Sequence, residues 1–268
     1  MTAECKTHYY SKNEIDAIAS NICNFKLPKK SYSFPASKVL ETSFSERVFD
    51  ELKRIRQFVE SIDQEFVQKF FRLVLISIID QCSLKIKDGN GLKFRKTPPK
   101  IESVKKLFLD KASKMLDDIR QANYDKNVQI IFGSATQQET IKKACKKKVG
   151  ICIFSPPYAN CFDYCEVYKQ ELWIGGFVNS YEDFEKYRSL AMRSHVNSKF
   201  VHDVKNTFPE VENVAETIRT FNIWNKNIPD MLKGYFDDMA LVLENIREML
   251  VKNAKVYIVV ANSAYKVF

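Results

Sequence analysis

Glycine, proline and tryptophan are scarce in this sequence, with 7, 8 and 2 residues among 268. Collagen-like and low-complexity proteins are excluded because they contain far more Gly or Pro, and the 45% of apolar residues excludes a disordered chain. No internal repeat is present either. The composition therefore predicts an ordered globular protein of one or two domains with a sizeable core.

Long apolar runs are also missing. The longest stretches, residues 73–79 and 256–261, are far shorter than the roughly 20 residues of a membrane-spanning helix, and no apolar signal segment follows Met1. The seven cysteines include no CxxC pair, and Cys161 and Cys165 have no nearby His to complete a metal site. We therefore expect a cytoplasmic protein with reduced thiols, no membrane contact and no bound metal.

Positive charge is in excess, with 42 Lys and Arg against 33 Asp and Glu. The balance favours a polyanionic partner, although an ordinary soluble surface explains it equally well. Lysines gather at residues 142–148, where a solvated helix face is the expected interpretation, and basic residues gather at 93–100. Contacts of such clusters with phosphates would weaken steeply with salt. Residues 177–229 form a polar insertion that either touches DNA or is a solvated excursion.

Residues 1–125 are expected to form a helical region broken by polar loops. Apolar residues at three-and-four spacing predict helices at residues 44–59, about 64–86 and about 101–122. Ser43 and Glu46 are expected to form a capping box ahead of the first of these helices. Gly89, Asn90 and Gly91 are expected to form the turn that ends the second.

The pattern changes in residues 126–268, which are expected to form a second domain. Residues 128–132 and 150–154 are nearly continuous apolar runs, typical of parallel strands covered on both faces, with a helix at 136–148 between them. A helix at about 231–250 and a strand at 255–261 follow. The fold class is therefore α/β, a partial doubly wound Rossmann-like sheet preceded by a helical N-terminal region.

A rigid loop with hydrogen-bond acceptors follows the strand expected at residues 150–154. There Ser155, Pro156, Pro157 and Tyr158 stand in succession. The two prolines fix two φ angles and remove two N–H donors, so the loop carbonyls point in set directions. Ser155 Oγ and the Pro156 carbonyl are suited to hold the hydrogens of a nucleobase amine, and Tyr158 is suited to stack on a base taken out of the helix.

This loop resembles the catalytic motif of the amino-group DNA methyltransferases, in which Ser, Asp or Asn precedes Pro-Pro and an aromatic residue at a strand end. The resemblance covers roughly residues 125–268. It continues upstream in Gly133, Ser134 and Ala135, and downstream in Asn160, Asp163, Tyr164, Tyr168, Glu171 and Leu172. The other Pro-Pro pair, residues 98–99, lacks a following aromatic and is expected to be a linker.

The family resemblance implies roles for these residues. Ser155, Pro156, Pro157 and Tyr158 would be catalytic, and Asn160, Asp163 and Tyr164 would bind the substrate. Gly133, Ser134 and Ala135 would contact the cofactor S-adenosylmethionine. Ser at the first motif position favours methylation of cytosine N4, with adenine N6 left open.

Two features of that family are absent from the sequence. No Phe-x-Gly-x-Gly segment is present to approach the methionine part of the cofactor. Ser134 stands where the family usually has an acidic residue to accept a bond from the adenine amine. We therefore expect an incomplete catalytic half, whose cofactor half is lost or supplied by a second polypeptide.

The sequence thus predicts an S-adenosylmethionine-dependent methyltransferase of a restriction-modification system that acts on double-stranded DNA with a flipped target base. Two alternatives stay open. One is a catalytically silent subunit that binds nucleic acid or another protein. The other is an RNA base amino-methyltransferase, because a flipped base amine in RNA suits a similar loop.

Because the glycine-rich cofactor loop is absent, we expect the isolated chain to bind S-adenosylmethionine poorly. Titration calorimetry measures this directly. A dissociation constant in the micromolar range would contradict the expectation.

Overall fold

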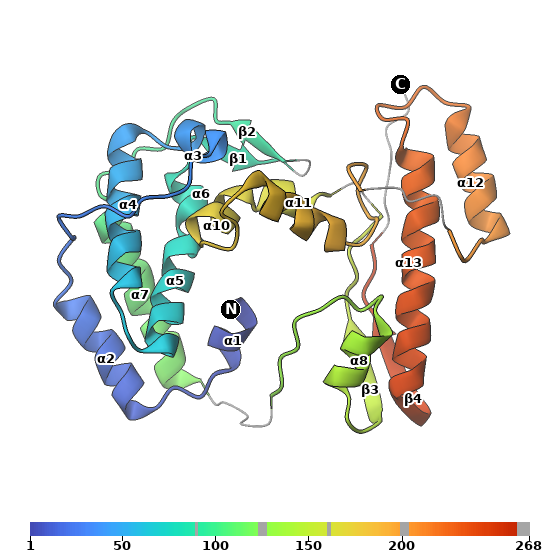
Figure 1. Ribbon diagram of the computed structural model, residues 1–268, viewed down its shortest axis with the longest axis horizontal. Coiled ribbons are helices and arrows are strands. Elements are labelled where there is room, and N and C mark those ends of the chain that lie inside the picture. The colour runs from blue at the N-terminus through green and yellow to red at the C-terminus, as the bar shows by residue number, and fades with distance from the viewer. Residues whose placement is uncertain (89–90, 123–127, 160–161, 199–203, 262–268) are drawn as a thin grey trace. The chain divides into compact units, whose positions relative to one another are not determined.

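The computed structural model describes residues 1–88, 91–122, 128–159, 162–198 and 204–261. It divides into two compact units (Figure 1). Unit 1 comprises residues 1–88, 92–128 and 168–183, and unit 2 comprises residues 89–91, 129–167 and 184–268. Among the described residues, no helix combines the length and apolarity needed to cross a membrane.

Unit 1 is mainly helical. Its helices are α1 (Thr2–Thr7), α2 (Lys12–Cys23), α3 (Lys38–Ser43), α4 (Glu46–Glu60), α5 (Glu65–Ser77), α6 (Ile79–Cys82), α7 (Val104–Gln121) and α10 (Lys169–Ile174). Helices α2, α4, α5 and α7 pack against one another (Figure 1). The predicted helices at 44–59 and 101–122 are confirmed by α4 and α7.

The centre of unit 1 is a cluster of phenylalanine rings. The Phe58 ring lies 4.8 Å from that of Phe25 and 5.3 Å from that of Phe71, both nearly perpendicular to it. Phe71 also lies 5.9 Å from Phe108, and both side chains are fully buried. Such edge-to-face pairs add about 0.5–1.5 kcal/mol each beyond the burial of apolar area.

The predicted capping box of Ser43 and Glu46 is wrong. Ser43 is the last residue of α3, and its hydroxyl donates to the Val39 carbonyl within that helix. A complete capping box is found instead at α2. There the Glu14 amide donates to Ser11 Oγ at 3.3 Å, and the Ser11 amide donates to Glu14 Oε2 at 2.7 Å.

The helix predicted at residues 64–86 is shorter than expected. It divides into α5 and α6, and the chain then enters strand β1 (Lys85–Lys87), which pairs antiparallel with β2 (Leu92–Phe94). The ladder pairs Lys85 with Phe94 and Lys87 with Leu92. The turn predicted at Gly89, Asn90 and Gly91 lies between β1 and β2 in the sequence, and residues 89 and 90 lie outside the described residues.

Unit 2 combines helices with a parallel strand pair. It contains α8 (Gln138–Ala144), β3 (Val149–Phe154), α9 (Tyr164–Val167), α12 (Pro209–Arg219), α13 (Ile228–Met249) and β4 (Leu250–Ile258). Helix α11 (Tyr181–Leu190) includes the point where the chain enters unit 2 again. Helix α13 packs against α12 and α8 and confirms the helix predicted at 231–250 (Figure 1).

Strands β3 and β4 pair in parallel, with Ile151 opposite Lys255 and Phe154 opposite Ile258. The strand predicted at 150–154 is confirmed, whereas the last strand begins at Leu250 rather than at residue 255. Asn253 interrupts the ladder with a φ of 65°, a left-handed conformation that Asn tolerates better than most residues.

The strand predicted at residues 128–132 is wrong. These residues form no strand, and Phe132 is 87% exposed. The expected burial of both sheet faces is also not found, because Ile153 is 70% exposed. An apolar run becomes a strand only when another strand pairs with it, and within the described ranges only β4 pairs with β3.

Candidate functional site

The loop of Ser155, Pro156, Pro157 and Tyr158 begins directly after β3, as the sequence predicts. The Val259 amide donates to the Phe154 carbonyl at 3.0 Å, so the strand pairing extends to the base of the loop. Pro156 is buried, Tyr158 is half-buried and Ser155 is exposed. The loop is thus anchored at its proline while its hydroxyl faces outward.

A hydrogen bond fixes the orientation of the Ser155 hydroxyl. Ser155 Oγ donates to the Val259 carbonyl at 3.2 Å and lies 3.5 Å from the Tyr158 hydroxyl. A serine hydroxyl has one hydrogen and two lone pairs. Because the hydrogen is used on Val259, the oxygen is left as an acceptor for Tyr158 and for an incoming N–H group.

Asp163 is a buried anchor of the chain that follows the loop. Its side chain is 1% exposed, and its Oδ1 accepts a 3.1 Å bond from the amide of Glu166 at the start of α9. Its Oδ2 lies 3.2 Å from both Arg188 Nε and Asn197 Nδ2. Asp163 therefore holds two segments of unit 2 together instead of facing solvent.

The neighbouring predicted substrate residues differ in their settings. Tyr164 is 48% exposed, and its ring lies 4.6 Å from that of Phe162 in an edge-to-face contact. Asn160 lies outside the described residues.

His195 is buried beside Asp163. It is 2% exposed, with Nδ1 3.6 Å from Asp163 Oδ2, and its ring nitrogens have no hydrogen-bond partner among the residues that the structure describes. Burial lowers the pKa of His195, the charge of Arg188 lowers it further, and Asp163 opposes the shift. Burial in the interior of unit 2 therefore favours the neutral form of the ring.

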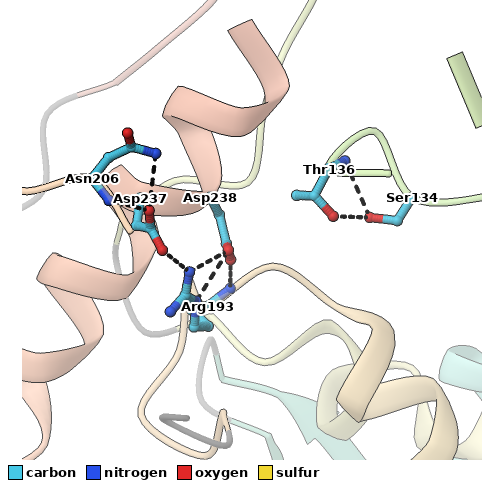
Figure 2. A network of polar contacts seen from close by, with 6 residues as sticks. All are labelled: Ser134, Thr136, Arg193, Asn206, Asp237 and Asp238. Atoms are coloured by element: carbon cyan, nitrogen blue, oxygen red, sulfur yellow. Dashed lines mark hydrogen bonds and ion pairs between the residues drawn. The ribbon is translucent and has the colours of Figure 1, made fainter. Parts of the chain in front are cut away.

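A second buried ionic cluster joins Arg193 to helix α13. Arg193 Nη2 lies 2.7 Å from Asp237 Oδ2 and 2.6 Å from Asp238 Oδ1, and the Arg193 amide donates to Asp238 Oδ2 at 2.8 Å. Asn206 contributes two further bonds to Asp237 Oδ1, from its amide at 2.8 Å and its side chain at 3.1 Å. Figure 2 shows Arg193 pointing toward both carboxylates. This cluster, which we call the Arg193 clamp, fastens Arg193 and Asn206 to α13.

The clamp keeps Asp237 ionised. Burial raises the pKa of this carboxyl, but hydrogen bonds from Arg193 and from the Asn206 and Lys205 amides outweigh it and hold the pKa below its ordinary value. With its side chain only 1% exposed, Asp237 is a paired and fully bonded buried charge. Such a charge is tolerated only while its partners remain.

The loop of Gly133, Ser134 and Ala135 is tied to its own neighbours. Ser134 Oγ lies 2.8 Å from Thr136 Oγ1 (Figure 2). The Ala135 carbonyl accepts a 2.9 Å bond from Asn245 Nδ2. A Cβ at Gly133 would come within 2.5 Å of the Thr140 side chain, so a larger residue here would displace Thr140.

A cavity of about 390 Å³ lies between this loop and the Arg193 clamp. Its polar lining comes from side chains that include Ser134, Thr136, Ser198, Arg193, Asp237 and Asp238. Ser198 is 8% exposed, and its buried hydroxyl has no hydrogen-bond partner among the described residues. The volume lies in the range of small-molecule sites, roughly 300–1,000 Å³, so the cavity fits part of a nucleoside-sized ligand. Residues 155–158 do not line it.

Sequence reasoning did not assign functions to Arg188, Arg193, Asp237 or Asp238. A signal was present for the two carboxylates, because Asp237 and Asp238 interrupt the apolar stripe of α13 between Tyr235 and Met239. Charged residues in a buried stripe are found paired. Their shared arginine partner, Arg193, lies about 45 residues away in the chain, and spacing alone does not identify it.

Comparison with known proteins finds two relatives. The chain is 26% identical over 244 residues to Type II methyltransferase M.AvaI from Nostoc sp. (strain PCC 7120) and, equally, to the same enzyme from Anabaena variabilis. Each match covers 79% of this chain and 50% of the relative, so the chain spans about half the length of the curated relatives it matches. No family model and no solved structure matches. The similarity supports a relationship to type II methyltransferases.

Replacement of the buried carboxylate in the Arg193 clamp should destabilise unit 2. Asp237→Asn leaves Arg193 short of one charged partner, and we expect a loss of about 1–3 kcal/mol at neutral pH. The folded-state pKa of Asp237 is depressed, so its stabilisation is complete above the unfolded pKa and is lost as pH falls through the folded pKa. Below about pH 4, the difference between variant and wild type should therefore shrink.

Urea unfolding followed by circular dichroism measures both effects. Asp230→Asn is the matched control, because Asp230 lies on the same helix and pairs with Arg219 at 2.6 Å on the surface. Its loss should be below about 1 kcal/mol. Equal losses in the two variants would show that the clamp adds no more stability than a surface pair.

Proposed function

We propose that this chain carries the target-base site of a DNA methyltransferase of a restriction-modification system. The reaction is methylation of an exocyclic amino group, with cytosine N4 favoured over adenine N6. The observation that carries the proposal is the exposed Ser155 hydroxyl at the end of β3, fixed as an acceptor by its bond to Val259. The similarity to M.AvaI, a type II methyltransferase, supports methyl transfer as the reaction.

The loop acts by holding the target amine. The lone pair of an exocyclic amine is delocalised into the ring, and bonds from its hydrogens to Ser155 Oγ and the Pro156 carbonyl favour a tetrahedral nitrogen. A nitrogen held in this way could accept a methyl group, with S-adenosylhomocysteine as the leaving group, and the product nitrogen would then release a proton, so no strong base would be needed before the transfer. Tyr158 stacks on the flipped base, an interaction worth about 1–3 kcal/mol.

The remaining predicted residues act around this loop. Tyr164, and Asn160 with it, would contribute to the wall of the base pocket. Asp163 would position that wall, because its buried carboxylate contacts the Glu166 amide in α9 as well as Arg188 and Asn197. These roles rest on the family resemblance and on the contacts of unit 2.

The methyl donor of this reaction class is S-adenosylmethionine, which supplies an electrophilic methyl group when bound. Ser134 and the hydroxyl of Ser198 are the residues best placed to hold part of it, because both line the 390 Å³ cavity. Gly133 and Ala135 would shape the same edge through their backbone. The comparisons give no support to a second polypeptide, which stays a prediction.

Removal of the Ser155 hydroxyl should lower methyl transfer to DNA by about 100-fold or more, the usual effect of deleting one group that stabilises a transition state. Tyr158→Ala should lower it by roughly 5- to 150-fold, the equivalent of one lost base stack. Incorporation of labelled methyl groups into duplex DNA at saturating S-adenosylmethionine measures both.

Ser113→Ala is the matched control, because it also removes an exposed serine hydroxyl but lies on α7 of unit 1. It should leave the rate unchanged. Full activity in Ser155→Ala would remove the assigned role of the loop. DNA binding with no methyl transfer in the wild type would favour the silent subunit, and transfer to RNA alone would favour the RNA enzyme.

A further inference from the structure

Positive charge in unit 1 is concentrated on and after the β1–β2 hairpin. Residues 84–100 contain six Lys or Arg side chains and one carboxylate, Asp88. This segment of 17 residues thus carries a formal charge of +5, more than half of the +9 of the whole chain. We call residues 85–87 and 92–100 the basic ribbon.

Two of these cations anchor the ribbon within unit 1. Lys87 Nζ lies 2.5 Å from Glu171 Oε1 and 4.1 Å from the centre of the Tyr168 ring. Arg95 donates to the Ser83 carbonyl at 3.0 Å and to the Asp80 carbonyl at 2.8 Å. These contacts hold both strands of the ribbon in place.

The remaining cations have no carboxylate partner. Lys93, Lys96 and Lys100 are exposed, and no carboxylate of the described residues lies within 4.0 Å of their ammonium groups. Lys85 donates to Thr42 Oγ1 at 2.7 Å and lies 5.0 Å from the Phe94 ring, which is 61% exposed. Burial and the charge of Lys169 lower the pKa of Lys85, as expected where positive charges crowd. An anion placed here would relieve that crowding.

The pairing of β1 with β2 determines on which face of the basic ribbon each charged side chain lies. In an antiparallel pair successive side chains alternate between faces, so Lys85 and Phe94, which are paired, share one face while Lys93 lies on the other. A two-stranded ribbon has the width to enter the DNA major groove. Cations on its two faces then approach the phosphate chains on either side of that groove. The deep, narrow major groove of an RNA duplex does not admit such a ribbon.

We propose that the basic ribbon binds the phosphodiester backbone of duplex DNA through Lys85, Lys93, Lys96 and Lys100. The choice of DNA as the partner rests on the proposed function. The inference adds a DNA-contacting surface in unit 1 to the target-base site proposed in unit 2. The ribbon supplies affinity without reading sequence, because phosphate contacts position a protein on DNA and do not specify bases.

The test is a triple variant, Lys93→Gln with Lys96→Gln and Lys100→Gln, in the full chain. Fluorescence anisotropy of a labelled duplex across a range of potassium chloride gives the slope of log affinity against log salt. Three lost phosphate contacts should reduce that slope by about 2 to 3 and weaken binding at least tenfold at low salt. The charge-matched control, Lys29→Gln with Lys30→Gln and Lys114→Gln, removes three other exposed lysines of unit 1 and should leave the slope unchanged.

The outcomes separate the two proposals. If the wild type binds duplex DNA and the triple variant keeps the slope of the control, the ribbon is not the contact surface and the proposed function stands. If the wild type does not bind duplex DNA, the proposed function itself fails. Tighter binding to duplex RNA than to DNA, lost in the triple variant, would overturn the choice of DNA as partner.

Discussion

The parallel pairing of β3 and β4 is the constraint on which the candidate site depends. It brings Phe154 and Val259 together where the two strands end, and the 3.0 Å bond between their backbones fixes the base of the loop. Because the Val259 carbonyl takes the one hydrogen of Ser155 Oγ, the hydroxyl can act only as an acceptor toward an amine. Without this pairing, two prolines and a serine would be an ordinary stiff turn.

The two units are held by different forces. Unit 1 relies on interlocked phenylalanine rings around Phe58, Phe71 and Phe108. In unit 2, buried ion pairs join segments that are distant in sequence, with Arg188 on Asp163 and Arg193 on Asp237. Buried ion pairs add little net stability compared with apolar packing, but removal of one partner is costly. The ion pairs of unit 2 therefore fix the positions of its polar segments, and they contribute little to the net free energy of folding.

Much of the secondary structure could be predicted from the sequence, because α4, α7 and α13 have strong helical periodicity and β3 is a short apolar run between turns. The position of Ser155 at a strand end followed from the same pattern. The strand at residues 128–132 failed because an apolar run does not reveal whether another strand is available to pair with it. The Arg193 clamp was missed since tertiary folding, and no local pattern, brings Arg193 to Asp237.

The most direct test of the central claim is the chemical identity of the methylated base. Duplex DNA treated with the protein and labelled S-adenosylmethionine is digested to nucleosides and analysed by mass spectrometry. The account predicts the label on an exocyclic nitrogen, as N4-methylcytosine or N6-methyladenine, because the Ser155 loop offers acceptors to an amine. Label on carbon 5 of cytosine would contradict it.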